Sequence, residues 1–573
     1  MMEEHDHHTY PRGRHLVKTV GDDHDEDDHN HVELTCAKSK DVFHDEDDYS
    51  HGSSLDSNGR KTQHEEQQGQ DEYEHDHDHP SSAIGSKRTP WYGTAIILLS
   101  EVMGTGILSL PYAAKTLGWT TTIISIPLFA VFASYAGWLL AQVHVKSPQV
   151  LHLEFHSYAD ASTTLLGRTF GQITHISMLL NWGALAIYYL IATADGIGDI
   201  FEIDCSYHRA MLAVVILVIP CQCRDFYAIS KYLSGPSTCS IILMVFVILG
   251  SLILHRNDSE YGTEDSVTLG DYNSTTNTTI HGSTNSTDTI NSTDTNNSEF
   301  VFGASTTIWP LPGTTLLEYL EAMSAFVFAY QGHAIFLELQ AEMKDAREFP
   351  FACSIGYIIM CLMYAMTVLV AYGLRGDQTE EFLPDILPDG PARQLVGVLV
   401  CLHITVSYVI ACQPLHMWLH ATIFPQTFQQ ESRLGSWHWF LLTCGYLLFG
   451  FLIGNCIPFF ADVQALIGSL FGAPSVFGWP VLFFVMLCRQ QQLQQQAELQ
   501  EQDQPNHVSN HHDSNMDSWW KTFQLMGGWH HVVVCAIFLF VLTPLFCILG
   551  TTGAIASIVQ DAEHAPEPFQ CNG

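Results

Sequence analysis

The chain has 573 residues, of which 47% are hydrophobic and 14% are charged, and its formal net charge is −37. The apolar residues are concentrated in long blocks, which excludes an ordinary soluble globular protein and is typical of the membrane class. The acidic charge says little about partners, because the first 89 residues alone hold 23 acidic against 9 basic residues.

Residues 1–89 form the first distinct segment. They are rich in Asp, Glu, His, Gln and Gly, so burial cannot offset the entropy of ordering them. The run HDHDH at His75–His79, with His5, His7 and His8, offers ligands for transition metals. However, the 13 His residues of this segment show no fixed ligand spacing. We therefore predict a disordered, acidic, His-rich cytoplasmic tail.

Eleven apolar blocks follow the tail. Most reach the ~20 residues that a helix needs to cross the hydrocarbon core of a bilayer. We predict an all-α membrane protein with eleven transmembrane helices over residues 90–558 and no cleavable signal peptide. An odd number of spans puts the termini on opposite sides and makes residues 559–573 a short non-cytosolic tail. The blocks cover residues 93–117, 119–144, 173–198, 208–223, 237–254, 316–340, 350–374, 394–420, 437–457, 459–487 and 529–558.

Two signals orient these spans. With a cytoplasmic N-terminus, eleven Lys and Arg residues near the spans are cytoplasmic and five are not, in line with the positive-inside rule. The same orientation puts the loop 255–315 outside the cytosol, and this loop holds every Asn-x-Ser/Thr sequon of the chain. An Asn/Ser/Thr-rich loop also contains sequons by chance. The sequons lie at Asn257 and at five predicted glycosylation sites, Asn273, Asn277, Asn285, Asn291 and Asn296.

The cytoplasmic segment 489–526 separates the last two spans. It contains a Gln run at Gln490–Gln496, and we predict a flexible loop with a helical start. The 15 Cys residues lie mostly inside spans and lack the spacing of a disulfide framework or a zinc cluster. We interpret them as small packing residues.

The first span is interrupted near its middle by Gly104, Thr105 and Gly106, and Pro111 follows. Backbone groups freed inside a membrane must be satisfied by protein or by a polar ligand. A second half-helix starting near Ile107 would turn its unpaired N–H groups and positive dipole end towards a carboxylate. The break therefore predicts a substrate site, although glycines also allow close helix packing.

The sixth span is interrupted in the same way, by Tyr330, Gln331, Gly332 and His333. It enters the membrane from the opposite face, five spans after the first. Two broken antiparallel spans at this separation are typical of an inverted repeat that relates spans one to five to spans six to ten. We predict a 5+5 inverted repeat with broken helices 1 and 6, plus one extra helix, in which both breaks form one site.

The stretches GTGILSLPYAAKTLGW at Gly104–Trp119 and FAYQGHAIFLELQAEMKDAREFP at Phe328–Pro350 resemble the first-span and sixth-span motifs of the amino acid/auxin permease family, within the amino acid, polyamine and organocation superfamily. The resemblance covers about residues 90–558. It implies the 5+5 fold with one extra helix, and a small or neutral amino acid as the substrate, moved with a proton or a sodium ion.

Glu101 is the clearest ionisable residue inside a span, where a charge costs roughly 2.5–3.5 kcal/mol. It precedes Gly104 by three residues, and burial there favours its protonated form. Two roles stay open: a proton-coupling group, or a structural partner for a hydroxyl, a backbone amide, His333 or His403. His333 occupies the position of the family's glycine-histidine pair and is a candidate to carry a proton, to bind substrate or to bond freed carbonyls.

Thr405 and Ser407 of the eighth span are the candidates for a sodium site. The resemblance implies this role, since some family members hold sodium there together with carbonyls of the first span. In those sodium-coupled members an Asn stands four residues before the first glycine, where this chain has Ser100. This departure favours protons over sodium.

Other polar residues in the spans have less specific interpretations. Those of the third span either line the same cavity or pack between helices: Asn181, Tyr188 and Tyr189. Three carboxylates lie nearer the outer ends of their spans, where a charge costs little, and we assign them no role: Asp195, Glu321 and Asp462.

The favoured function is secondary active, proton-coupled transport of neutral amino acids by alternating access. The alternatives are a sodium-coupled amino acid transporter, an amino-acid-sensing receptor with little flux and a metal-ion transporter. A metal transporter needs paired ligands inside its spans, whereas His333 and His403 are well separated. No P-loop and no enzyme motif occurs, so we expect no ATP-driven transport, catalysis, cofactor or nucleic-acid partner. The expected location is a vacuolar, lysosomal or plasma membrane, in contact with membrane lipid.

Overall fold

The computed structural model describes residues 89–104, 106–203, 205–224, 226–254, 306–428, 432–456, 460–502, 515–563 and 571. All of them belong to one unit, residues 48–573. Residues 1–88 of the predicted tail, Thr105 and all six sequons lie outside the described residues.

The described residues fold into helices, with no strand element among them. Among the described residues, eight helices are long and apolar enough to cross a membrane, and Trp91–Val102 and Ser206–Gln222 are shorter apolar helices. The all-α membrane class is thereby confirmed, and the count of eleven spans stays a prediction. The main helices are α1 (Trp91–Val102), α2 (Gly106–Leu151), α3 (Tyr158–Leu166), α4 (Arg168–Phe201), α5 (Ser206–Val218), α6 (Phe226–Leu254), α7 (Leu316–Ala329), α8 (Phe336–Glu342), α9 (Phe349–Arg375), α10 (Pro391–Ile423), α11 (Pro425–Phe428), α12 (Arg433–Gly454), α13 (Phe460–Ile467), α14 (Trp479–Gln502), α15 (Asn515–Leu525), α16 (Trp529–Ile537) and α17 (Thr551–Ala562).

Short helical segments join several of these helices. The 3₁₀ turns are η1 (Pro220–Gln222), η3 (His333–Ile335), η4 (Ala346–Glu348), η5 (Gly376–Gln378) and η6 (Leu383–Ile386). Stretches of π-helix, η7 (Gly468–Gly472) and η8 (Pro474–Gly478), connect α13 to α14, and η9 (Phe538–Leu542) and η10 (Leu545–Gly550) connect α16 to α17.

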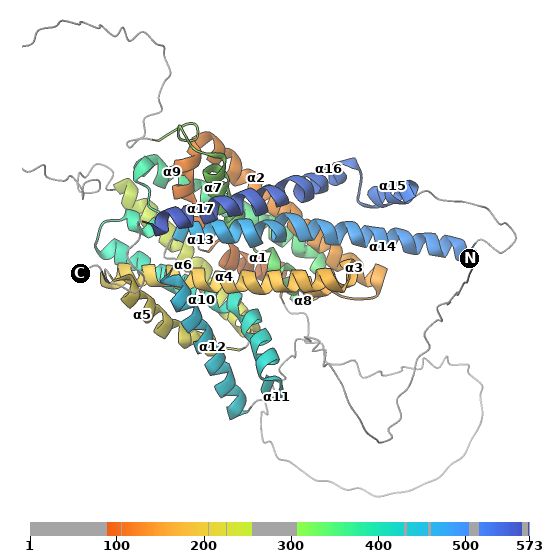
Figure 1. The fold of residues 1–573 in the computed structure, drawn as a ribbon, viewed down its shortest axis with the longest axis horizontal. Helices are drawn as coiled ribbons and strands as arrows, with labels where there is room; N and C mark the ends of the chain where they lie inside the picture. Colours follow the sequence, from red (N-terminus) through yellow and green to blue (C-terminus); the bar gives the residue numbers. More distant parts are fainter. Residues whose placement is uncertain are drawn as a thin grey trace, which may run out of the picture. The chain divides into compact units, whose positions relative to one another are not determined.

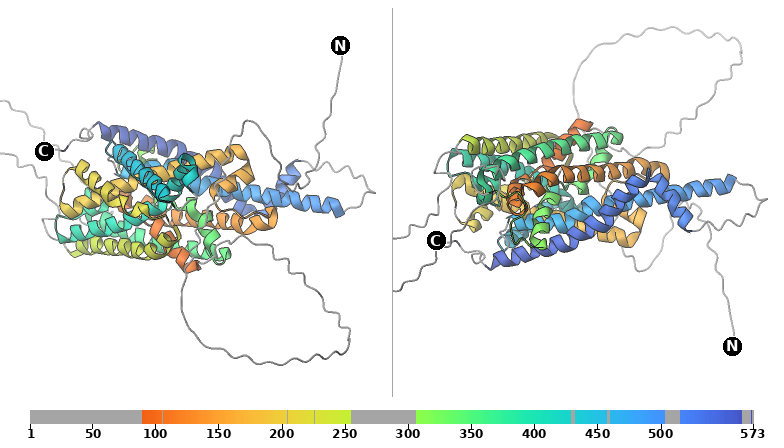
Figure 2. Two further views of the ribbon diagram at one scale, coloured as in Figure 1. Left: turned by 90° about the horizontal axis from the view of Figure 1, so that it is seen from below. Right: turned by 90° about the horizontal axis from the view of Figure 1, so that it is seen from above.

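Large apolar side chains cover the outer surfaces of the helices. Val131, Leu362 and Phe540 are 63%, 66% and 73% exposed. Soluble proteins rarely expose extended apolar surfaces, whereas the acyl chains of a bilayer can cover them. The long helices run side by side (Figures 1 and 2), so this surface suits contact with lipid.

Gly118 divides α2 into two helices. Its φ of 69° lies in the left-handed region, which favours glycine. A Cβ at this position would collide with the carbonyl of Trp309. The following amide, of Trp119, donates to the carbonyl of Thr307 at 2.9 Å. The backbone freed by the kink is therefore paired with the segment that precedes α7.

The two parts of α2 run antiparallel. Gly106, before the kink, lies against Ala329, and Ala133, after the kink, accepts a hydrogen bond from His333. Ala329 and His333 belong to the same short segment. The two parts of α2 can both reach this segment only if the chain turns back at Gly118. Residues 106–117 therefore continue the direction begun by α1, and residues 119–151 form a separate helix.

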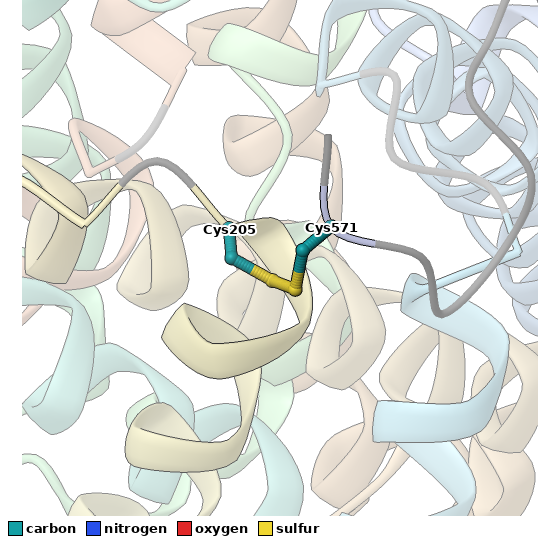
Figure 3. The surroundings of a disulfide bond; sticks show 2 residues. All are labelled: Cys205 and Cys571. Carbon is teal, nitrogen blue, oxygen red and sulfur yellow. A yellow bond between two sulfur atoms is a disulfide. The ribbon is translucent and has the colours of Figure 1, made fainter. Parts of the chain in front are cut away.

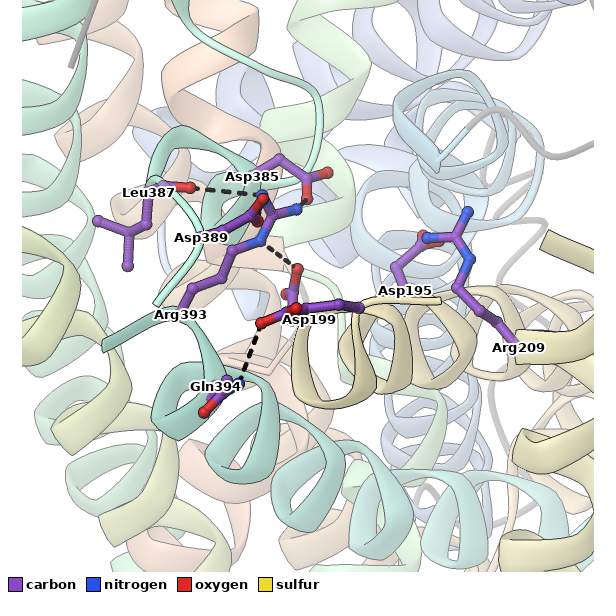
Figure 4. Close-up of polar contacts among 9 residues, drawn as sticks. Asp195, Asp199, Arg209, Asp385, Leu387, Asp389, Arg393 and Gln394 are labelled. Atoms are coloured by element: carbon purple, nitrogen blue, oxygen red, sulfur yellow. Dashed lines mark hydrogen bonds and ion pairs between the residues drawn. The ribbon is translucent and has the colours of Figure 1, made fainter. Parts of the chain in front are cut away.

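Arg393, near the start of α10, ties α10 to the end of α4 (Figure 4). Its guanidinium donates to Asp199 at 2.7 Å, to Asp385 at 2.5 Å and to Asp389 at 3.2 Å. Asp385 lies in the loop between α9 and α10, where burial raises the pKa of its carboxyl and the charge of Arg393 opposes that rise. One cation thus fixes α4, α10 and this loop together.

A disulfide joins Cys205, between α4 and α5, to Cys571, beyond α17 (Figure 3). The interpretation of the cysteines as packing residues is wrong for this pair. The two cysteines are 366 residues apart, so local spacing cannot reveal their contact. The other cysteines of the described residues are free.

The Gln-rich segment is more helical than predicted. Helix α14 continues through the Gln run to Gln502, and α15 covers Asn515–Leu525. Gln, Leu, Ala and Glu are good helix formers, so the helix continues beyond the apolar part of the span.

Candidate functional site

The two predicted breaks are interruptions between helices, and they touch each other. Helix α1 ends at Val102 and α2 begins at Gly106, while α7 ends at Ala329 and helical structure resumes at His333. A Cβ on Gly332 would collide with the side chain of Val102. The glycine therefore allows the second break to approach the first.

Two tyrosines of α9 satisfy backbone carbonyls that the breaks leave free. The Tyr364 hydroxyl donates to the carbonyl of Ala329 at 2.8 Å and lies 3.4 Å from that of Val102. The Tyr357 hydroxyl donates to the carbonyl of Tyr330 at 3.1 Å. Such carbonyls need partners inside a membrane, so α9 stabilises both breaks. These tyrosines were not among the predicted site residues, although their i, i+7 spacing puts two hydroxyls on one face of an apolar helix.

Helix α10 contacts the first break from another side. The Ser407 hydroxyl lies 3.4 Å from the carbonyl of Ser100, and the Nδ1 atom of His403 lies 2.9 Å from the Ser237 hydroxyl. A Cβ on Gly104 would lie 2.9 Å from the other ring nitrogen of His403, Nε2. The buried face of α10 therefore packs directly on the end of α1.

A cavity lies beside the two breaks. Predicted site residues in its lining are Glu101, Gly106, Gln331, Gly332 and His333. Helix α4 contributes Asn181, Trp182, Leu185 and Tyr189, and η8 contributes Ser475. The break residues of two spans that are distant in the sequence thus share one cavity with α4.

Four polar side chains of this lining carry buried atoms without a hydrogen-bond partner among the described residues. These atoms are the Oε2 of Glu101, the Oδ1 of Asn181, both amide atoms of Gln331 and the Nδ1 of His333. Buried polar groups in folded proteins are normally paired, so several unpaired ones around one cavity point to a polar ligand there.

The hydrogen bond of His333 fixes the chemistry of its free nitrogen. Its Nε2 atom lies 3.0 Å from the carbonyl oxygen of Ala133, which can only accept. The Nε2 atom must therefore carry the hydrogen, and in the neutral ring Nδ1 is an acceptor. With Glu101 and Asn181, the cavity offers three acceptors suited to an ammonium group.

The other predicted site residues that the structure describes do not line this cavity. Ile107 and Tyr330 are buried beside the breaks, and Thr405 is half-buried on α10. Gly104 and Ser407 contact the break as described above. Thr105 lies outside the described residues. The Oε2 atom of Glu101 bonds neither His333 nor His403, the two histidines considered as its structural partners.

Ser475 and Trp182 are lining residues that the sequence analysis missed. Ser475 follows Pro474 in a π-helical stretch, a form of helix often found at functional sites. A Cβ on nearby Gly472 would collide with the side chain of Gln331. The sequence GAPSVFG at residues 472–478 was therefore a usable signal, because small residues and proline in a span mark close approach or irregular backbone.

Comparison with known proteins gives a consistent result. A family model described as transmembrane amino acid transporter protein matches residues 87–291 and 294–507. Amino acid transporter AVT1C of Arabidopsis thaliana is 23% identical over 408 residues, which are 68% of this chain and 62% of that relative, less than two thirds of its length. Amino acid transporter ANT1 of Arabidopsis thaliana is 22% identical over 423 residues, 71% of this chain and 87% of that relative.

A solved structure of MhsT in complex with L-phenylalanine aligns with 83% of this chain and 100% of its own, at 10% identity and a TM-score of 0.46.

Proposed function

Since this chain belongs to the transmembrane amino acid transporter family, we propose that it is a secondary active transporter that moves neutral amino acids with protons by alternating access. Its substrate is an amino acid, and its working environment is membrane lipid.

The observation that carries this proposal is the cavity between the breaks, with its unpaired polar atoms. Helix α2 begins at Gly106 in the cavity wall, so its first N–H groups and positive dipole end suit the substrate carboxylate. Glu101, Asn181 and His333 offer acceptors for the ammonium group. The positive start of α2 and several hydrogen-bond acceptors in one cavity wall fit the carboxylate and the ammonium group of an α-amino acid zwitterion.

The apolar part of the cavity supports a neutral side chain. Trp182, Leu185, Phe328 and Ile335 contribute to its wall. A charged side chain placed against these residues would lose its water without gaining a partner, which is costly. An aliphatic or aromatic side chain gains from the same burial.

Proton coupling is assigned to Glu101. It is the acidic residue in the cavity lining, and its Oε2 atom is buried without a partner. Protonation removes a charge whose burial is costly, and the carbonyl oxygen of the neutral carboxyl can still accept a hydrogen bond from the ammonium group, so the cavity can hold proton and substrate together. A sodium site at Thr405 and Ser407 is the alternative. The Ser407 hydroxyl contacts the Ser100 carbonyl, which is an arrangement of oxygen atoms that supports this alternative sodium site.

We propose eleven spans with a cytoplasmic N-terminus, arranged as a 5+5 inverted repeat plus one helix. Helix α1 with residues 106–117 would form the first span, and α7 with η3 and α8 would form the sixth. The disulfide supports this orientation, because Cys205 and Cys571 would both lie outside the cytosol, where disulfides persist. A vacuolar or lysosomal membrane and the plasma membrane both satisfy this condition.

Alternating access would move the broken spans against α4 and α10. Arg393 fixes α4 to α10, whereas glycines at both breaks allow the spans to bend. The cavity lies between these groups of helices, so such a movement would open it to one side at a time.

The test is uptake of labelled amino acids into proteoliposomes with an imposed pH gradient. We expect accumulation of neutral amino acids that collapses when an ionophore removes the gradient. Uptake that depends on sodium instead would overturn the proton assignment. Specific binding without flux would replace transport with an amino-acid-sensing receptor, and a lack of both would refute the proposed function.

A further inference from the structure

Glu321 of α7 and Asp462 of α13 have their carboxyl groups in hydrogen-bond contact, away from the cavity. Asp462 is 4% exposed, and Glu321 is half-buried. Ionised carboxylates can only accept hydrogen bonds, so this contact needs a proton on one of the two groups. Carboxylates this close share a proton because both cannot easily be ionised.

In the part of the chain that the structure describes, no cation is among the groups that act most strongly on the pair. The groups that act most strongly on the two carboxyls are each other, the Ser557 hydroxyl and further carboxylates. Lys115 of α2 acts instead on Glu381. The titratable groups that surround the pair are Tyr112 of α2, Glu318 of α7, Glu381 of the loop after α9, and Asp561 of α17.

One carboxyl oxygen of Asp462 has no hydrogen-bond donor among the described residues. The Oδ2 atom of Asp462 is buried without a hydrogen-bond partner. The nearby backbone N–H of Ala461 donates to Glu381 at 3.3 Å and not to Asp462. A proton shared with Glu321 is the partner that the chemistry of this buried group demands.

The pair bridges helices that contact different parts of the site. Glu321 precedes Ala329, at the end of α7, by eight residues, which is about 12 Å of helix rise. On α13, Gln464 accepts hydrogen bonds from Ser109 of α2 at 2.6 Å and from Tyr188 of α4 at 2.8 Å. The Glu321–Asp462 contact therefore joins the broken span that forms the cavity to a helix anchored on α4.

We propose that Glu321 and Asp462 share one proton and form a second proton-binding site, which holds α7 against α13. Loss of the proton leaves a buried and a half-buried carboxylate that repel each other, so α7 separates from α13 and the cavity opens on that side. In the topology proposed above, this side faces away from the cytosol. The effect on flux rests on the proposed transport function, whereas the shared proton does not.

The first test measures thermal stability of the purified full chain in detergent from pH 5 to pH 8. The native contact needs a proton that the unfolded chain does not bind at neutral pH, so stability should fall as the pH rises. In Glu321→Gln and in Asp462→Asn an amide donates to the remaining carboxylate without a proton. Both variants should lose the part of the pH dependence that the pair contributes. The matched control is Glu498→Gln, at an exposed position of α14, which should keep the parent profile.

The second test measures amino acid exchange at equal pH on both sides of proteoliposomes. The parent should change its exchange rate with pH, and both amide variants should give flatter profiles while they still exchange. If both variants keep the parent profiles of stability and of exchange, the shared proton is refuted.

If an amide variant does not fold, a pair of cysteines at the same two positions provides a separate test of the contact. Oxidation of a Glu321→Cys/Asp462→Cys double variant should stop exchange, and reduction should restore it, whereas either single variant should not respond. Exchange that continues after verified cross-linking would overturn the opening step. A parent without binding or exchange would refute the transport function, while its pH-dependent stability would still test the shared proton.

Discussion

Gly106 of α2 and Ala329 of α7 approach so closely that a Cβ on the glycine would lie 2.7 Å from the Ala329 Cα. This contact joins the two broken spans at the wall of the cavity. We expect Gly106→Ala to weaken amino acid binding and flux, because overpacking costs about 1–3 kcal/mol and the neighbouring atoms are backbone. Gly106→Val should abolish both.

Binding and proteoliposome uptake measure this effect. Gly250→Ala is the matched control, since nothing lies within 4 Å of a Cβ at that position of α6. Unchanged affinity in Gly106→Ala would remove the substrate from the first break.

Glu101→Gln tests the coupling role. The amide keeps the size of the side chain and removes its proton-binding group. Accumulation driven by a pH gradient should therefore be lost, while exchange of substrate across the membrane should continue. Glu498→Gln, at an exposed position, should behave as the parent. Gradient-driven uptake at the normal rate would assign Glu101 a structural role.

Tyr364→Phe removes the hydroxyl that donates to the Ala329 carbonyl. A buried acceptor left without its donor costs about 1–3 kcal/mol, so the variant should melt at a lower temperature in detergent. Tyr92→Phe is the control, because Tyr92 is 58% exposed. Equal melting temperatures of Tyr364→Phe and the parent would mean that the break does not depend on α9.

Arg393→Ala leaves Asp199, whose side chain is only 2% exposed, without its ion-pair partner. Breaking a buried pair costs about 3 kcal/mol, so a marked loss of thermal stability should follow. Asp389→Asn is the comparison variant, since the Asp389 side chain is 77% exposed and its pair with Arg393 should contribute little. Similar melting temperatures of both variants would contradict this ranking.

Glycosylation tests the orientation. With a cytoplasmic N-terminus, endoglycosidase should increase the gel mobility of the expressed chain. A variant with Asn273, Asn277, Asn285, Asn291 and Asn296 all changed to Gln should migrate like the treated protein. A parent whose mobility never responds would weaken the assigned topology.

The helical fold was largely predictable from the sequence, because long apolar blocks have few other solutions in a membrane. The family assignment was predictable from motifs around Gly104 and Gly332, and the family match confirms it. The helices do stop near both glycine clusters, since glycine weakens a helix at these points.

The partners of the breaks were not predictable in the same way. Tyr364 and Ser475 contact the site from helices with ordinary apolar patterns, and only the packing of distant segments shows where their side chains point. The Cys205–Cys571 bond has no local signal either. A sequence reports what each helix prefers, whereas these features depend on which helices become neighbours.

The same bond has a consequence for the integrity of the chain. Cys205 precedes residues 255–305 and Cys571 follows them, so the disulfide closes a covalent ring that includes this segment. A single proteolytic cut within it would open the ring without releasing either piece. The two fragments would stay covalently joined through sulfur until a reductant separates them, so one cleaved molecule would migrate as a single species on a non-reducing gel.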